Sequence, residues 1–427
     1  MKEMEQAGAN RRLGKGILLL FLGIAVMLTA CNAAQAPSST TGEAPSSAGQ
    51  TQPSAGAGTG QTAAEKKEYV IGESIELSGP LAGASGTAYH QGLELFVKEL
   101  NAKGGIDGIP VRLKVLDNES DPTKAVTTVQ QLLQDESVLA IAGLSATPTT
   151  MPVIPVAQEG KIPIIVGGSS TGIAVPVKEW VFKTTFNQNM AIERYVDYFK
   201  EKGITKVAQI AVNNAFGADT APIFEKMVKE AGLELVGYEM ADPAALDVKP
   251  QLSKLRDSGA EAIVSWTVSP LAQIVSKNAA ELNIQVPVIF SAAVAQQSFI
   301  DQTGEASEGN IIVAGAPTGA QTLPDDHPIK DEMLRVMEVY KNEYNSDFNY
   351  VSALGWDAGT LLTAAIGKLQ QEGQEVTREG IRDALESVGP VQGFNARYQM
   401  SPADHVGVSK EDIMFFEVKN GQFTFHY

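Results

Sequence analysis

The chain has 427 residues, of which 44% are hydrophobic and 19% are charged, and its formal net charge is −17. This composition indicates a globular protein, and the length that follows about Lys67 supports two domains of ordinary size. The acidic balance argues against binding to nucleic acid or to an anionic membrane surface.

The N-terminal residues carry the pattern of an export signal. Basic residues at positions 11–15 precede an apolar run over 17–28, which ends in the sequence LTAC at Cys31. The run is short for a transmembrane span, and small residues follow it, as expected at a cleavage site. We therefore interpret residues 1–30 as a signal peptide.

Cys31 is the only cysteine of the chain, so it cannot form an internal disulfide in an exported protein. The order LTAC resembles the lipobox of bacterial lipoproteins. The resemblance implies that Cys31 carries a lipid and anchors the chain to the outer side of the cell membrane. The alternative is an ordinary signal peptide, or a short anchor, in which Cys31 is incidental.

The segment 31–66 consists mostly of Ala, Ser, Thr, Gly, Pro and Gln. It has too little apolar surface to bury in a core, so its composition predicts a flexible, solvated linker. We expect it to separate the lipid anchor from a folded body.

The body alternates strand and helix patterns. A hairpin is predicted over 413–427, with its turn at Asn420-Gly421. Asp121 is placed to cap the second helix. Apolar runs predict strands at 70–77, 111–117, 138–143, 162–168, 207–212, 262–267, 287–292 and 311–316. Helices are predicted at 86–102, at 122–134, from about Pro148, and at 330–344, 352–369 and 377–388.

This alternation predicts parallel sheets with helices on both faces, which bind ligands at the carboxyl ends of their strands. The loops at those ends are rich in small, hydroxyl-bearing residues and glycine and poor in charge. They suit hydrogen bonding to a ligand better than acid–base or metal chemistry. These loops are 77–85, 144–150, 167–172, 213–219, 267–272 and 291–296.

The sequence offers little for catalysis. None of the four histidines, which are His90, His327, His405 and His426, has metal-ligand spacing to another histidine or to a cysteine. The chain contains neither a G-x-S-x-G nucleophile motif nor a phosphate-binding P-loop. We therefore predict a protein that is not an enzyme and that uses no metal or cofactor.

Several motifs of the body resemble those of the branched-chain amino-acid (Leu/Ile/Val) binding proteins of bacterial ABC transporters. The specific ones are Leu-Ser-Gly-Pro after the first predicted strand, Asn-Ala-Lys-Gly-Gly-Ile after the first helix, and Asp-x-x-x-Asp-Pro after the second strand. Weaker matches follow in the same order, namely AGLSATPTTMP, GGSS, NNAFG and GWDAG. The resemblance covers residues 69–427.

The resemblance implies a type I periplasmic binding protein fold, with two Rossmann-like α/β lobes joined by a three-crossover hinge near 185–190, 314–320 and 388–395. One lobe would comprise 67–186 with 318–391, and the other 187–317 with 392–427. The implied function is extracytoplasmic capture of a small amino-acid-like, amide or carboxylate ligand between the lobes and its delivery to the permease and ATPase of an ABC importer. A ligand sensor that reports to a membrane receptor would share this fold, and a lipid-anchored hydrolase is a further alternative.

The resemblance also implies ligand-binding positions. Thr147, Ser169 and Ser170 would hold the carboxylate of a ligand at a helix start, where free N–H groups favour an anion. The alternative is that Thr147 and Ser169 are only helix caps. Phe216 would form an aromatic wall or belong to the core, and Trp266 would face the cleft or the core.

The family's ammonium-binding acid is missing. The resemblance places that position near Ala293, and no acidic residue occurs between Glu281 and Asp301. The loop after the first predicted strand also lacks the aromatic residue that the family has near Ser85. Ser85 itself is a further candidate contact. Glu76 would supply a substitute charge, or be a solvent-exposed carboxylate, which we favour.

Overall fold

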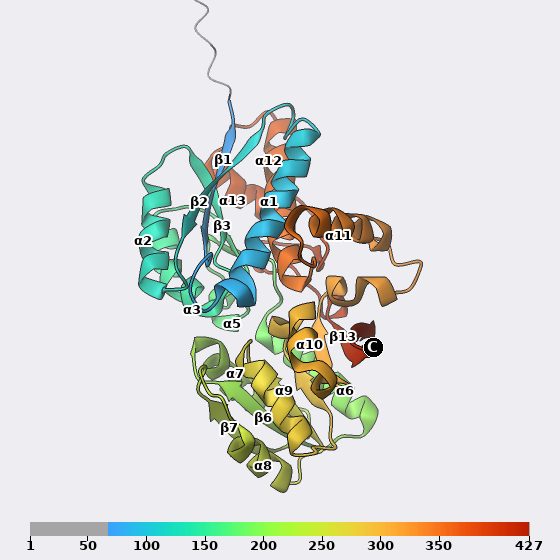
Figure 1. The fold of residues 1–427 in the computed structure, drawn as a ribbon. Helices are drawn as coiled ribbons and strands as arrows, with labels where there is room; N and C mark the ends of the chain where they lie inside the picture. Colours follow the sequence, from blue (N-terminus) through green and yellow to red (C-terminus); the bar gives the residue numbers. More distant parts are fainter. Residues whose placement is uncertain (1–66, 427) are drawn as a thin grey trace, which may run out of the picture. The chain divides into compact units, whose positions relative to one another are not determined.

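The fold is described from a computed structural model, which describes residues 67–426. The predicted signal peptide and the whole predicted linker, including Cys31, lie outside the described residues. Two sheets organise the described chain, and each is the centre of a lobe (Figure 1).

The sheet of the first lobe has five parallel strands in the order β2-β1-β3-β4-β5. Its strands are β1 (Tyr69–Ile75), β2 (Val111–Asp117), β3 (Val138–Gly143), β4 (Ile164–Val166) and β5 (Val181–Lys183).

Helices cover both faces of this sheet, because alternate residues of each strand point to opposite sides. In β1, Ile71 packs into a core that includes α1 and α12, whereas Val70 packs into a separate core that includes α2 and α4. The helices of this lobe are α1 (Thr87–Ala102), α2 (Pro122–Leu133), α3 (Thr147–Thr150), α4 (Ile154–Glu159), α5 (Thr171–Ala174), α12 (Tyr350–Gln371) and α13 (Arg378–Ser387).

The helices α1 and α12 lie side by side and touch through their backbones (Figure 1). A Cβ atom added to Gly92 of α1 would lie 1.9 Å from the Ser352 carbonyl oxygen, and one added to Gly355 of α12 would lie 2.0 Å from that of Tyr89. Neither glycine can therefore carry a side chain without separating the two helices.

The sheet of the second lobe has the order β14-β13-β10-β9-β8-β6-β7. Five strands are parallel, namely β6 (Lys206–Val212), β7 (Glu234–Ala241), β8 (Ala262–Trp266), β9 (Val288–Phe290) and β10 (Ile311–Ala314). The predicted C-terminal hairpin, β13 (Met414–Lys419) and β14 (Gln422–Phe425), adds two antiparallel strands at the β10 edge. The helices around this sheet are α6 (Gln188–Lys202), α7 (Ala215–Glu230), α8 (Lys249–Asp257), α9 (Leu271–Glu281) and α10 (Gln297–Thr303).

The chain passes between the two sheets three times: between β5 and α6, between β10 and α11 (Lys330–Tyr344), and between α13 and β13. The third passage includes the short strands β11 (Val391–Gln392) and β12 (Arg397–Tyr398), which pair with each other.

The buried carboxylate of Asp357, in the motif GWDAG of α12, fixes this third passage. It accepts hydrogen bonds from the backbone N–H groups of Phe394 (2.7 Å) and Asn395 (2.9 Å). The Tyr398 hydroxyl lies 2.8 Å from the same carboxylate and 2.6 Å from the carbonyl of Thr184, which belongs to the first passage. The side chain of Tyr398 thus connects the third crossing segment to the first.

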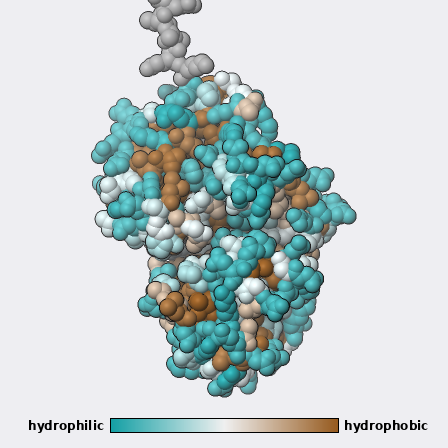
Figure 2. Space-filling view, viewed as in Figure 1, coloured by the Kyte–Doolittle hydropathy of each residue, from teal (hydrophilic) through white to brown (hydrophobic). Residues whose placement is uncertain are grey.

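Most predicted elements are confirmed, with small shifts at their ends. The capping role of Asp121 is also confirmed, since its carboxylate accepts the backbone N–H groups of Thr123 and Lys124. No helix within residues 67–426 combines the length and apolarity that a membrane crossing requires. Hydrophilic residues dominate the face in Figure 2, where hydrophobic residues form smaller patches on both lobes.

Candidate ligand-binding site

A cavity lies between the lobes at the carboxyl ends of the strands, and it holds about 780 Å³ of empty space, part of it open to solvent. None of the residues that line this cavity has an ionisable acidic or basic group other than the phenol of Tyr350. Six of the predicted contacts line it: Ser85, Thr147, Ser169, Phe216, Trp266 and Ala293.

Two hydrogen bonds join the lobes beside this cavity. The Ser170 hydroxyl donates to Asp219 of α7 at 2.6 Å, and the Gln296 amide donates to the carbonyl of Ala84 at 3.2 Å. The lobes are therefore in contact beside the cavity.

Ser170 does not take the place that was expected for it. Its hydroxyl accepts the backbone N–H of Gly172 at 3.2 Å, which caps α5, and donates to Asp219. Both hydrogen-bonding directions of the hydroxyl are thus occupied by protein groups. The structure places Ser170 at the contact between the lobes and leaves it out of the cavity wall.

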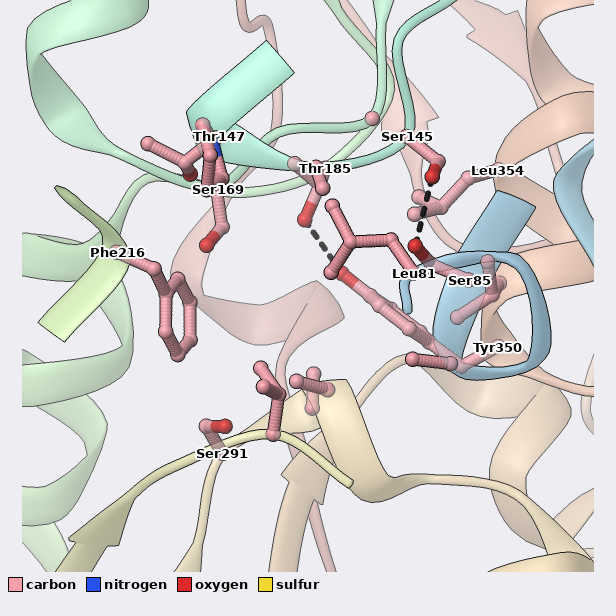
Figure 3. Close-up of a pocket in the computed structure, with 18 of the residues that line it drawn as sticks. Leu81, Ser85, Ser145, Thr147, Ser169, Thr185, Phe216, Ser291, Tyr350 and Leu354 are labelled. Carbon is pink, nitrogen blue, oxygen red and sulfur yellow. Dashed lines mark hydrogen bonds between the residues drawn. The ribbon is translucent and has the colours of Figure 1, made fainter. Parts of the chain in front are cut away.

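Thr147 and Ser169 lie at one end of the cavity, and the Ser169 hydroxyl projects into it (Figure 3). The Thr147 hydroxyl oxygen accepts the backbone N–H of Ser170 at 3.3 Å. Among the described residues no acceptor takes the Thr147 proton, so this hydroxyl can donate to a ligand oxygen.

Ser85 and Ser145 lie at the other end, where their hydroxyl oxygens are 2.7 Å apart (Figure 3). Behind them is Glu76, which is fully buried. Its carboxylate accepts the Ser145 hydroxyl at 2.6 Å, the Ser145 backbone N–H at 3.1 Å and the hydroxyl of Thr149.

The interpretation of Glu76 as a solvent-exposed carboxylate is therefore wrong. Burial raises the pKa of Glu76, and the hydrogen bonds from Ser145 and Thr149 oppose this effect. A buried carboxylate persists where several donors compensate for its lost hydration, which the sequence of one strand does not reveal. Glu76 is not a cavity-lining residue, so it gives no direct contact for a ligand ammonium.

Aromatic side chains form part of the wall. The rings of Phe216 and Trp266 stack with centroids 5.4 Å apart and an interplanar angle of 24°. Asn214 caps α7 by accepting the Phe216 backbone N–H at 3.0 Å, and this places Phe216 at the cavity. Both rings are buried and also line the cavity, so each residue belongs to the core and to the cavity wall.

Sequence reasoning missed residues beside the crossing segments. The hydroxyls of Thr185 and Tyr350 are 2.6 Å apart at the cavity wall, with the ring of Phe186 next to Tyr350 (Figure 3). A residue at the point where the chain changes lobe is a reasonable candidate contact. Thr185 and Tyr350 are far apart in the sequence, however, and only the packing of α12 brings their hydroxyls together.

On the second lobe, Ser291, Ala292 and Ala293 line the cavity without a charged group. The Ser291 hydroxyl donates to the carbonyl of Thr267 at 3.2 Å. The position of the family's ammonium-binding acid is therefore occupied by small neutral residues.

The remaining titratable groups near the site have protein partners. The buried Lys183 amine donates to the Ser170 carbonyl at 3.1 Å and to the side chain of Asn187 at 2.7 Å. His90 contacts the buried Glu73 at 2.8 Å and does not line the cavity. No group of acidic, histidine or cysteine side chains suited to a metal ion occurs within residues 67–426.

Known proteins resemble this chain in sequence and in fold. A Leu/Ile/Val-binding protein homolog of Brucella melitensis is 26% identical over 256 residues, which cover 59% of this chain and 69% of that protein. Another Leu/Ile/Val-binding homolog, from Brucella abortus, is 27% identical over 192 residues, which cover only 49% of that protein.

The crystal structure of an extracellular ligand-binding receptor from Rhodopseudomonas palustris superposes with a TM-score of 0.76 and 26% identity, covering 84% of this chain and 99% of that one. A branched-chain amino acid transporter substrate-binding protein from Streptococcus pneumoniae, solved with isoleucine, shares the fold with a TM-score of 0.72 and 22% identity, covering 84% and 98%. These similarities confirm the predicted type I fold. The model of the periplasmic binding protein family matches residues 68–422, and the chain is therefore a member of that family.

Proposed function

We propose that this protein captures a small ligand with a carboxylate or amide group, and without an α-ammonium group, and delivers it to an ABC importer. The observation that carries the proposal is the cavity between the lobes, whose wall offers hydroxyls and aromatic rings and no acidic or basic side chain. Family membership supports the role of a transporter's binding protein.

One end of the cavity suits an oxygen acceptor. Thr147 has a hydroxyl proton that no described protein group accepts, and the Ser169 hydroxyl lies beside it. A carboxylate or amide oxygen of the ligand would receive these donors. Charged hydrogen bonds of this kind contribute about 1.5–3 kcal/mol each.

The rest of the wall disfavours a zwitterion. An ammonium group in the cavity would lack a carboxylate partner, since Ala293 and its neighbours are neutral and Glu76 lies behind Ser145. Leaving an ammonium unpaired in a buried site costs several kcal/mol. We therefore expect leucine, isoleucine and valine to bind weakly.

The proposal extends to location. The predicted lipid on Cys31 and the linker 31–66 would hold the body just outside the cell membrane, within reach of a permease. This arrangement would keep the binding protein near its transporter.

A thermal-shift screen followed by titration calorimetry on the purified protein tests the ligand class. The screen would compare amino acids with amides, short carboxylates and aromatic acids, because a ligand at a hundredfold excess over its Kd adds about 2.7 kcal/mol of stability. We expect the best binder to lack the α-ammonium group. Submicromolar binding of leucine or valine would overturn this assignment.

A further inference from the structure

The hydrogen bonds around Glu76 determine which way the hydroxyls of the cavity wall point their protons. Three groups form a chain from the protein interior to the cavity: the Glu76 carboxylate, the Ser145 hydroxyl at 2.6 Å from it, and the Ser85 hydroxyl at 2.7 Å from Ser145. Ser85 and Ser145 line the cavity, whereas Glu76 is fully buried behind them.

With Glu76 ionised, the proton count leaves one arrangement. A carboxylate only accepts, so Ser145 must give its single hydroxyl proton to Glu76. The short contact between the two serines then requires Ser85 to donate to Ser145. Ser85 has no proton left, and it presents only lone pairs to the cavity.

The arrangement is the same when Glu76 carries a proton on Oε1, the oxygen that faces Thr149, because Oε2 can then still accept the Ser145 backbone N–H at 3.1 Å and the Ser145 hydroxyl. Thr149 can then direct its own proton to the carbonyl of Ala146 at 3.0 Å. Ser145 still donates to Oε2, and Ser85 still donates to Ser145.

We infer that the ligand carries a neutral hydrogen-bond donor, a hydroxyl or an amide N–H, which Ser85 accepts, and that Glu76 is the positioning residue that makes Ser85 an acceptor. This inference rests on the proposed function and narrows its ligand class. A ligand hydroxyl that met a donating serine would leave a proton unpaired, whereas an accepting serine satisfies it.

The two ends of the cavity then have opposite polarity. Thr147 and Ser169 offer donors at one end, and Ser85 offers an acceptor at the other, with Thr185 and Tyr350 between them (Figure 3). A ligand with an acid or amide oxygen at one end and a donor at the other fits both. A simple carboxylic acid fits only the first end.

Matched pairs of acids test this polarity by calorimetry on the purified protein. The pairs are 4-methylpentanoate with its 2-hydroxy derivative, and benzoate with its 2-, 3- and 4-hydroxy derivatives. We expect at least one hydroxylated acid to bind at least about tenfold more tightly than its parent. A buried ligand hydroxyl that finds its acceptor gains binding free energy, whereas one without an acceptor loses it. If a parent acid binds as tightly as its hydroxy derivatives, the inference is overturned and the proposed function stands. If leucine or valine binds at submicromolar concentration and no acid of either kind binds, both are overturned.

Variants then separate positioning from structure, with the tightest hydroxylated acid and its parent as the two probes. Glu76→Gln should keep the preference for the hydroxyl, because its amide oxygen can accept from Ser145 while its amide N–H groups face Thr149. Glu76→Leu should reduce the preference to near unity, since the Ser145 proton becomes free to turn toward Ser85. Ser85→Ala should do the same without touching Glu76.

Ser78→Ala provides the matched serine control in the same loop, because Ser78 bonds to Asp117 and does not line the cavity. It should keep the full preference. Loss of the preference in Glu76→Gln, or its retention in Ser85→Ala, would overturn the inference, even if Glu76→Leu did not fold.

Discussion

Hydroxyl side chains provide most of the directed polarity in the cavity, and two of them are held by a backbone or buried group. Thr147 is oriented by the backbone N–H of Ser170, and Ser145 by Glu76. A hydroxyl held in this way loses little freedom when a ligand binds, so a larger share of its hydrogen-bond energy appears as affinity.

Thr147→Ala should therefore weaken ligand binding. The loss of one hydrogen bond to a charged oxygen corresponds to about tenfold to a hundredfold in Kd. Calorimetry with the tightest ligand of the screen measures this change. Thr127→Ala, on the exposed side of α2, should leave the Kd unchanged. Unchanged affinity in the Thr147 variant would remove this residue from the site.

Lys183 predicts a dependence of stability on pH. Burial lowers the pKa of Lys183 to about 7, and the Asp219 carboxylate opposes this effect. An unfolded lysine titrates near 10.4, so between about pH 7 and pH 10 the unfolded state binds more protons, and stability rises with pH by up to about 1.4 kcal/mol per unit. The contribution of Lys183 to the free energy of unfolding is complete above the pKa of the unfolded lysine and is lost as the pH falls toward 7.

Urea unfolding at about pH 7 and pH 9 can measure this, with the difference between wild type and Lys183→Met as the readout. We expect wild type to gain stability relative to the variant as the pH rises. The exposed Lys226→Met should follow wild type at both values. A constant difference between wild type and Lys183→Met would show that Lys183 keeps an ordinary pKa.

The sequence predicts many residues of the candidate site but not the buried group that orients its hydroxyls. The resemblance to the family pointed to Thr147, Ser169, Phe216 and Ser85, and all four line the cavity because the geometry of parallel sheets brings the loops after their strands together. The burial of Glu76 could not be predicted, since its partners follow β3. Tyr350 was missed because it starts a helix that only the tertiary packing brings to the cavity.

At the scale of elements, α12 connects the first lobe to a segment that crosses between the lobes. Its glycine contact with α1 joins it rigidly to the first lobe, and Asp357 holds the third crossing segment. A crossing segment that is fixed at one end bends at a defined place, which is what a hinge requires.

Asp357→Ala should destabilise the protein strongly. The change leaves the backbone N–H groups of Phe394 and Asn395 without their buried partner, and such losses cost about 1–3 kcal/mol for each unsatisfied group. A lowered midpoint in urea unfolding tests the expectation. Asp383→Ala removes an exposed carboxylate of the neighbouring α13 and should change stability by less than about 1 kcal/mol.

The alternation of elements was predictable because buried parallel strands are continuous apolar runs. Besides the two-residue strands β11 and β12, two strands of the main sheets were nevertheless missed. The strand β5 has only three residues, Val181–Lys183, and one of them is a buried lysine. In β7, Gly237 and glutamates interrupt the apolar pattern, since this strand lies at the sheet edge and is only partly buried.

For the whole molecule, the proposed function combines two lobes with an attachment to the membrane. The family supplies the binding role, and the N-terminal sequence supplies the predicted anchor, which lies outside the described residues. These two parts make independent contributions, so they can be tested separately.

Cys31→Ser should move the protein from the membrane fraction to the soluble fraction or the medium. The body should keep its melting temperature and its ligand affinity, because a linker of such composition has no core to contribute. Fractionation of cells followed by a high-salt wash decides the question. Retention of the variant in the washed membranes would contradict lipid anchoring through Cys31.

The uncharged wall of the cavity also has a kinetic consequence. Charged clefts attract oppositely charged ligands and lose this advantage as ionic strength rises, because the Debye length shortens. A wall without acidic or basic side chains provides no such local attraction, and the net charge of −17 gives an anion at most a weak, screened repulsion. The rate of capture should therefore change little with salinity. This suits a receptor that works outside the membrane, where the cell does not control the ionic strength.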